Sequence, residues 1–105
     1  MSHPRWSLDT VIHAPIRLSI TAALAAVDEA DFKSIREAVE ITDSALSKQI
    51  ALLEEAGYVQ VRKTFVGKRG RTWLSLTKAG RTALDRHLNA LREIAGWDAE
   101  DTRPH

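Results

Sequence analysis

Apolar residues recur at helical spacing through the first 57 positions of the chain. Residues 14–27 carry apolar positions on two adjoining faces: Ile16, Ile20, Leu24 and Val27 on one, and Leu18, Ala22 and Ala25 on the other. Pro15 suits the first turn of this helix, because that position needs no backbone N–H. With two apolar faces, the helix is expected to lie between the domain core and a further partner, such as a second subunit.

Two shorter helices follow, and each has a residue suited to capping its N-terminus. Asp31 can cap a helix whose apolar positions are Phe32, Ile35, Ala38 and Val39. Thr42 can cap the next one, whose expected buried stripe is Leu46, Ile50 and Leu53. Gly57 predicts a left-handed cap at the end of this third helix, with Tyr58 packing back on Leu53. Because only Glu40 and Ile41 separate the second helix from Thr42, the second and third helices form a helix-turn-helix unit.

The apolar period then changes to two, which predicts strands. Val59, Val61 and Phe65 alternate with polar residues, and a second β-favouring run covers residues 73–77. The segment Gly67-Lys68-Arg69-Gly70 lies between the two runs and predicts a turn. We therefore expect a β-hairpin with a basic tip.

The last third of the chain predicts one more helix. Thr77 can cap it, and its apolar positions, Leu84, Leu88, Leu91 and Ala95, run to an expected end near Gly96. The order of elements predicts an α+β, mainly α, winged helix-turn-helix fold with three helices, a two-stranded β-hairpin wing and a C-terminal helix. We divide the chain into an N-terminal extension at residues 1–7, this domain at residues 8–96 and a flexible acidic tail at residues 97–105.

Length and composition restrict the classes of protein that this chain can belong to. Its 105 residues, 44% of them hydrophobic, suit one globular domain with a modest core. The absence of cysteine excludes disulfides, thiolate zinc sites and a cysteine nucleophile, and it fits the reducing cytoplasm. The longest apolar run, residues 22–27, is too short for a signal peptide or a membrane span, so no membrane partner is expected.

The formal net charge is only +1, but the charges are unevenly distributed. Residues 58–84 contain seven basic residues and no acidic one, whereas acidic residues outnumber basic ones on both sides of this block. A block of one sign indicates either a partner of opposite charge or a solvated charged surface, and the block alone does not separate the two.

Several segments resemble known regulators in their order and spacing. They are TDSALSKQI at residues 42–50, LEEAGYV at 53–59, FVGKRGRT at 65–72, LTKAGR at 76–81 and LDTVIHAPIRL at 8–18. In these segments the chain resembles the short, single-domain winged-helix transcriptional regulators of the MarR/ArsR-like group. This resemblance covers roughly residues 8–92 and implies sequence-specific binding of double-stranded DNA in transcription regulation.

The third helix is the expected recognition helix. With its apolar stripe turned inward, Ser44, Ser47 and Lys48 lie on the outer surface, since positions three and four apart share a face. Small and basic side chains allow a helix to enter the major groove and reach base edges. The DNA-contacting residues expected there are Asp43, Ser44, Ala45, Ser47, Lys48 and Gln49. An ordinary solvated helix surface is the alternative.

The hairpin is expected to contact the minor groove and the phosphates. Lys68 and Arg69 at the tip suit a narrow minor groove, and Arg62, Lys63 and Arg71 on the stem suit adjacent phosphates. The alternative is a hairpin whose charges protect an exposed strand edge from pairing with other chains.

A single module that reads one half-site binds weakly, so we expect a homodimer. The expected interface combines apolar residues of the N-terminal extension, the first helix and the last helix: Trp6, Leu8, Leu18, Ala22, Leu88, Leu91 and Ile94.

Other functions have less support from the sequence. None of the four histidines has the spacing of a catalytic triad or a metalloprotease motif, so no catalytic residue, and no cofactor, is expected. A metal-responsive ArsR-type repressor is an alternative, with Asp85, His87, Asp98 and Asp101 as ligands, but three carboxylates and one imidazole suit zinc poorly. A winged helix that binds RNA or protein is the other alternative. No residue pattern identifies a small-molecule effector.

Overall fold

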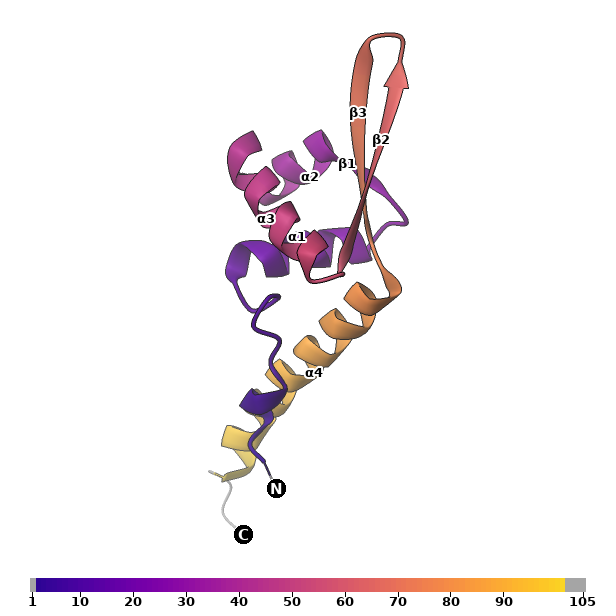
Figure 1. Ribbon diagram of the computed structural model, residues 1–105. Helices are drawn as coiled ribbons and strands as arrows, with labels where there is room; N and C mark the ends of the chain where they lie inside the picture. The colour runs from indigo at the N-terminus through magenta and orange to yellow at the C-terminus, as the bar shows by residue number, and fades with distance from the viewer. Residues whose placement is uncertain (1, 102–105) are drawn as a thin grey trace.

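The computed structural model describes residues 2–101, and it describes the side chains of residues 2–96 (Figure 1). The elements in chain order are the 3-10 helix η1 (Pro4–Ser7), α1 (Pro15–Ala25), β1 (Ala30–Asp31), α2 (Phe32–Val39), α3 (Asp43–Glu55), β2 (Val59–Val66), β3 (Arg69–Leu76) and α4 (Lys78–Asp101). This arrangement confirms the predicted winged helix fold.

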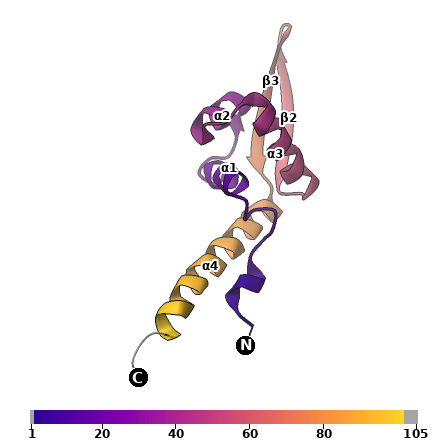
Figure 2. The same ribbon diagram turned by 90° about the vertical axis from the view of Figure 1, so that its left-hand side faces the viewer.

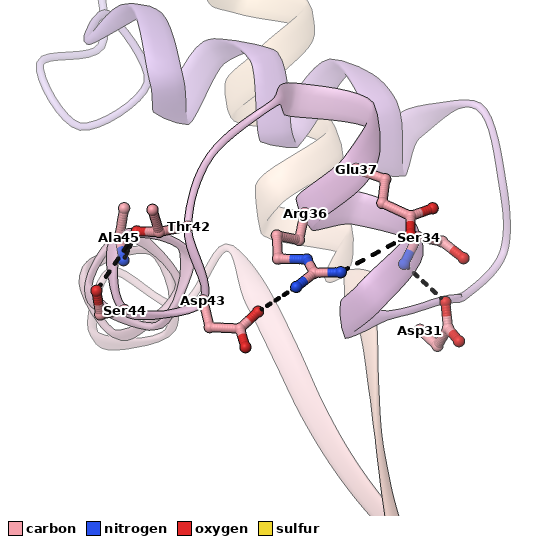
Figure 3. Close-up of polar contacts among 8 residues, drawn as sticks. All are labelled: Asp31, Ser34, Arg36, Glu37, Thr42, Asp43, Ser44 and Ala45. Carbon is pink, nitrogen blue, oxygen red and sulfur yellow. Dashed lines mark hydrogen bonds and ion pairs between the residues drawn. The ribbon is translucent and has the colours of Figure 1, made fainter.

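Local capping interactions start the helices where the sequence predicts. Asp31 Oδ1 accepts a hydrogen bond from Ser34 N at 3.0 Å, and Thr42 Oγ1 accepts one from Ala45 N at 3.1 Å (Figure 3). Thr77 Oγ1 accepts one from Gly80 N at 2.9 Å at the start of α4. Each bond satisfies a backbone donor that has no partner within its helix.

Gly57 ends α3 in the left-handed conformation that the sequence predicts. Its φ is +81°, and Tyr58 N donates to Leu53 O at 2.9 Å. Such a bond closes the last helical turn and reverses the chain into β2.

The core lies where α1, α2 and α3 meet the sheet and the first turns of α4. Its buried hydrophobic residues are Ile12, Ile20, Leu24, Ile35, Leu46, Ile50, Leu53, Val59, Leu74, Leu76 and Leu84. Ile16 and Val27, which the helical spacing placed with Ile20 and Leu24, are 39% and 41% exposed. Thr21 is fully buried instead, and it can be because its hydroxyl donates to the carbonyls of Arg17 and Leu18.

The sheet has three strands in the order β1-β3-β2, all antiparallel. The strands β2 and β3 form the predicted two-stranded hairpin, and β1 is a further strand that the sequence did not predict. The two residues of β1 pair with Leu74 and Trp73, and no periodicity can signal a strand of that length. The hairpin turn is also tighter than predicted, since Val66 pairs with Arg69 and leaves only Gly67 and Lys68 between the strands. Gly67 has a φ of +64°, as a two-residue hairpin turn requires.

The last helix is longer than predicted. It continues through Gly96 to Asp101, so the expected helix end near Gly96 was wrong; an exposed glycine costs a helix only about 1 kcal/mol relative to alanine. Residues 102–105 of the predicted acidic tail lie outside the described residues.

The molecule is elongated, with principal extents of 68 × 24 × 21 Å. The hairpin projects from one end and α4 from the other, and η1 runs beside α4 (Figures 1 and 2). Over residues 2–101, no helix combines the length and apolarity that crossing a membrane requires.

Candidate nucleic-acid interface

The outer surface of α3 carries the small polar and basic side chains that the sequence assigns to base reading. Ser44, Ser47 and Lys48 are exposed, and Ala45 is half-buried beside them. Asp43, at the first position of the helix, forms a 3.0 Å ion pair with Arg36 of α2 (Figure 3). This pairing offsets the negative charge that Asp43 would otherwise present to a phosphate.

Gln49 is oriented differently from the other predicted residues of α3. It is half-buried, and its side-chain oxygen accepts a 2.8 Å hydrogen bond from Arg17 Nη1 of α1. The Nε of Arg17 donates to Val11 O. Gln49 therefore helps to hold α3 against α1, a role that the surface pattern of α3 did not reveal.

The hairpin divides its basic residues between two faces, because neighbouring residues of a strand point in opposite directions. Lys63 pairs in register with Thr72 and shares a face with Val61, whereas Arg62 and Arg71 lie on the other face with Trp73. The guanidinium groups of Arg62 and Arg71 lie 5.8 Å and 5.4 Å from the Trp73 ring centroid. The three basic residues predicted for the stem, Arg62, Lys63 and Arg71, are therefore on the stem but divided between its two faces.

Two acidic residues, Glu29 in the connection between α1 and β1 and Asp31 in β1, neutralise that second face. Glu29 forms a two-pronged ion pair with Arg62, with distances of 3.0 Å and 2.5 Å, and this bond lowers the pKa of the Glu29 carboxyl. Asp31 Oδ2 lies 4.0 Å from Arg71 Nε. Within residues 2–96, three basic side chains of the wing form no ion pair: Lys63, Lys68 and Arg69. They are the cations most available to a phosphate.

A groove separates α3 from the hairpin, and two of the predicted DNA-contacting residues, Ser47 and Lys63, line it. Ser47, Ala51 and Glu54 of α3 form one wall, and Lys63 and Thr72 form the other. The outward face of the helix and the Lys63 face of the wing therefore border one continuous depression.

A buried polar cluster that the sequence did not predict connects α4 to the N-terminal segment. His87 is fully buried, and its Nδ1 accepts a 3.0 Å hydrogen bond from Asp9 N. His13 Nδ1 lies 3.4 Å from His87 Nε2. The Asp9 carboxylate accepts from Val11 N, Ile12 N and the Tyr58 hydroxyl, and the last bond raises the pKa of Tyr58. The sequence does not predict the contact between His13 and His87, because 74 residues separate them.

The structure does not bring together His87 and Asp85, two of the ligands expected for a metal-responsive repressor. His87 faces Asp9 in the interior, whereas Asp85 is exposed on another side of α4. In the described part of the chain, no three histidine or acidic side chains are placed to hold a metal ion. The side chains of Asp98 and Asp101 lie outside that part.

The His87 cluster predicts a pH dependence of folding stability. Burial, and then the neighbouring His13, lower the pKa of His87, so between this pKa and about 6.5 the unfolded chain binds more protons than the folded one. Stability is therefore complete above pH 7 and falls as the pH drops through about 6.5, by at most about 1.4 kcal/mol per pH unit. Urea denaturation at pH 7.5, 6.5 and 5.5 measures this slope.

The control is His87→Asn, whose amide oxygen can accept the Asp9 N–H bond but does not titrate. The titratable groups that face His87 are His13 and Asp9, whose carboxylate also accepts from Tyr58, and the variant leaves them unchanged. We expect a smaller slope in the variant; equal slopes in both proteins contradict the assignment to His87.

The residues predicted for a dimer interface lie on α1, α4 and the N-terminal segment. Trp6 is 73% exposed and Ala22 is exposed, whereas the other five, Leu8, Leu18, Leu88, Leu91 and Ile94, are half-buried within one chain. Pro4 is buried where η1 packs on α4, so part of the N-terminal extension belongs to the packed structure.

The fold and this interface define a winged helix DNA-binding protein. The profile of the winged helix DNA-binding domain family matches residues 16–95, and the chain belongs to this family. A transcriptional regulator homologue from Pyrococcus horikoshii OT3 is 27% identical, with a TM-score of 0.81 over 96% of this chain and 99% of that one.

Two further relatives extend this comparison. A MarR family transcriptional regulator from Silicibacter pomeroyi is 22% identical, with a TM-score of 0.64 over 97% of this chain and 68% of that one. The uncharacterized protein MJ0432 from Methanocaldococcus jannaschii is 25% identical over 85 residues, which are 81% of this chain and 92% of that protein. The architecture is thus that of the MarR-like transcriptional regulators.

Proposed function

We propose that this chain regulates transcription as a homodimer that binds double-stranded DNA, with α3 in the major groove and the wing on the minor groove and its phosphates. The observation that carries this proposal is the groove between α3 and the hairpin. Ser47 and Lys63 lie on opposite walls of this groove. One duplex can therefore contact the outer surface of α3 and the basic side chains of the wing that form no ion pair. The absence of cysteine supports the reducing cytoplasm as its place of action.

A mobility-shift assay with random duplex DNA and with RNA of the same sequence, at 50 mM and 200 mM salt, tests the function. We expect a shift of the duplex DNA that weakens strongly at the higher salt, because binding releases counterions from the phosphates. Stronger binding to RNA, or no binding to either nucleic acid, contradicts the proposal and favours the RNA-binding or protein-binding alternative.

The residues of α3 are expected to set the preferred sequence. Ser47→Ala and Lys48→Ala should each lower the preference for the selected site over random duplex, by about 1–3 kcal/mol for each lost base contact. Selection from a random duplex library, followed by anisotropy titration, measures this preference. Glu55→Gln, at the far end of the same helix, is the control that should leave it unchanged. Equal weakening on selected and random duplexes argues against base reading.

The dimer is supported by the position of the exposed apolar residues. Trp6 and Ala22 offer uncovered apolar surface on the N-terminal segment and α1, and residues 88, 91 and 94 of α4 add half-buried leucine and isoleucine side chains. Two copies joined there would present two wings to one duplex. Light scattering at micromolar concentration should give twice the chain mass of 11.7 kDa, and a monomer contradicts the dimer.

A further inference from the structure

The tip of the wing exposes two large apolar side chains. Phe65 is 70% exposed and Val66 is 82% exposed, at the end of the hairpin that projects beyond the helices (Figure 1). Neighbouring strand residues point to opposite faces, so the two side chains flank the tip rather than cover each other. The core lies at the other end of the hairpin, and neither side chain contributes to it.

The Phe65 ring is held across the hairpin. Its partner in register is Gly70, and a Cβ atom at Gly70 would lie 3.2 Å from Phe65 Cε1. The absence of a side chain at Gly70 thus leaves space for the ring. Beyond this pair come only the Val66–Arg69 pair and the two-residue turn at Gly67 and Lys68, so the ring lies close to the tip of a short hairpin.

Cations surround this apolar pair. Lys63 lies two residues before Phe65 on the same face, Lys68 lies in the turn, and Arg69 pairs in register with Val66. None of the three has an ion pair within residues 2–96, and the basic block that contains them has no acidic residue. An apolar tip between free cations matches a surface that is apolar in its interior and bordered by phosphates.

The minor groove of DNA is such a surface, because its sugars and base steps lie between two rows of phosphates. Apolar side chains that enter it can part a base step and bend the duplex, at a cost of a few kcal/mol that the additional contacts offset. Pyrimidine-purine steps open most easily.

We propose that Phe65 and Val66 enter the minor groove as an apolar wedge and part a base step there, while Lys63, Lys68 and Arg69 contact the phosphates on either side. This inference rests on the proposed DNA binding. It adds a second source of sequence preference, because flexible steps such as TA accept the wedge more readily than stiff ones.

Salt dependence separates an apolar contact from an ionic one. Phe65→Ala should weaken binding to duplex DNA about tenfold, as expected for the loss of a buried aromatic ring, with no change in the slope of log K against log salt. Lys68→Ala should instead lower that slope by about one unit. Phe65→Leu keeps an apolar side chain and should retain most of the affinity.

Base unstacking provides the second readout. A duplex with 2-aminopurine in its TA steps should gain fluorescence when the wild-type protein binds, and it should gain little with Phe65→Ala at saturating protein. Leu52→Ala, which removes an exposed apolar side chain from α3, is the matched control and should behave as wild type. Thermal melting checks that each variant folds, as expected for exposed positions.

The outcomes are distinct. If wild type and Phe65→Ala bind duplex DNA with equal affinity and equal fluorescence gain, the wedge is wrong and the proposed function stands. If the variant changes the salt slope, the ring acts through the neighbouring cations and the wedge is also wrong. If the wild type does not bind duplex DNA but binds anionic vesicles through Phe65, both the wedge and the proposed function fail.

Discussion

Gly80→Ala is expected to lower the free energy of unfolding by about 2 kcal/mol. A Cβ atom at Gly80 would overlap the carbonyl oxygen of Tyr58 and would lie 3.0 Å from its carbonyl carbon. Both atoms belong to the backbone, so relief requires the start of α4 to move away from the start of β2. Overpacking of this kind costs about 1–3 kcal/mol or more and exceeds the roughly 1 kcal/mol that alanine gains over glycine in a helix.

Hydrogen bonds around Gly80 hold the start of α4 against the start of β2. Thr77 N donates to Tyr58 O at 3.0 Å, and the Thr77 hydroxyl donates to Gly57 O at 2.6 Å. The same hydroxyl caps α4 by accepting from Gly80 N. Movement of α4 would therefore strain the cap, the end of α3 and the start of the wing together.

Gly96→Ala is the matched control for Gly80→Ala. It makes the same change in the same helix, but no atom lies within 4 Å of the added Cβ. We expect it to leave stability unchanged or to raise it by up to about 1 kcal/mol. Urea denaturation of both variants at one protein concentration measures the difference. A Gly80→Ala protein as stable as the Gly96→Ala protein contradicts the close approach of α4 to Tyr58.

Replacement of Lys63, Lys68 and Arg69 together by alanine is expected to weaken binding to every duplex several hundredfold at about 0.1 M salt. Each cation that contacts a phosphate adds about 0.9 to the slope of log K against log salt, so the triple variant should lose close to three units. Arg69→Ala alone should lose about one unit and weaken binding to all sequences.

Lys78→Ala is the control for this wing prediction. It removes a charge from the same basic block, but Lys78 is at the start of α4, at the opposite end of the hairpin from the tip. Anisotropy titrations between 50 mM and 300 mM salt give the slopes. Unchanged slopes in the triple variant, or an equal loss in Lys78→Ala, mean that the wing does not contact the phosphates.

Features set by neighbouring residues were predictable from the sequence. The caps at Asp31, Thr42 and Thr77 and the left-handed end at Gly57 are interactions over a few residues, and the structure confirms each of them. The extent of α4 was not predictable in the same way, because Gly96 is a helix breaker only in the absence of other interactions that favour the helix.

Features that depend on distant pairing were not predictable. The strand β1 exists only because Ala30 and Asp31 lie beside β3, which is more than 40 residues away in sequence. The burial of His87 depends on a hydrogen bond to Asp9, 78 residues away. No local sequence pattern around Asp9 or His87 indicates that these two residues are in contact.

The candidate interface shows the same division. The basic tip of the wing follows from the glycines and the hairpin pattern, so Lys68 and Arg69 could be selected from sequence. The neutralisation of Arg62 depends on Glu29, which comes from the acidic half of the chain and meets the wing only in the folded protein. A count of basic residues therefore overstates the charge that the wing offers to DNA.

An NMR titration of the ¹⁵N-labelled protein with a short duplex reports DNA binding and the location of the bound duplex in one experiment. We expect amide shift changes confined to two regions, residues 43–51 of α3 and residues 63–70 of the wing, with α4 beyond residue 84 unaffected. Changes centred on α4 or η1, or no change at millimolar DNA in low salt, would contradict DNA binding by α3 and the wing.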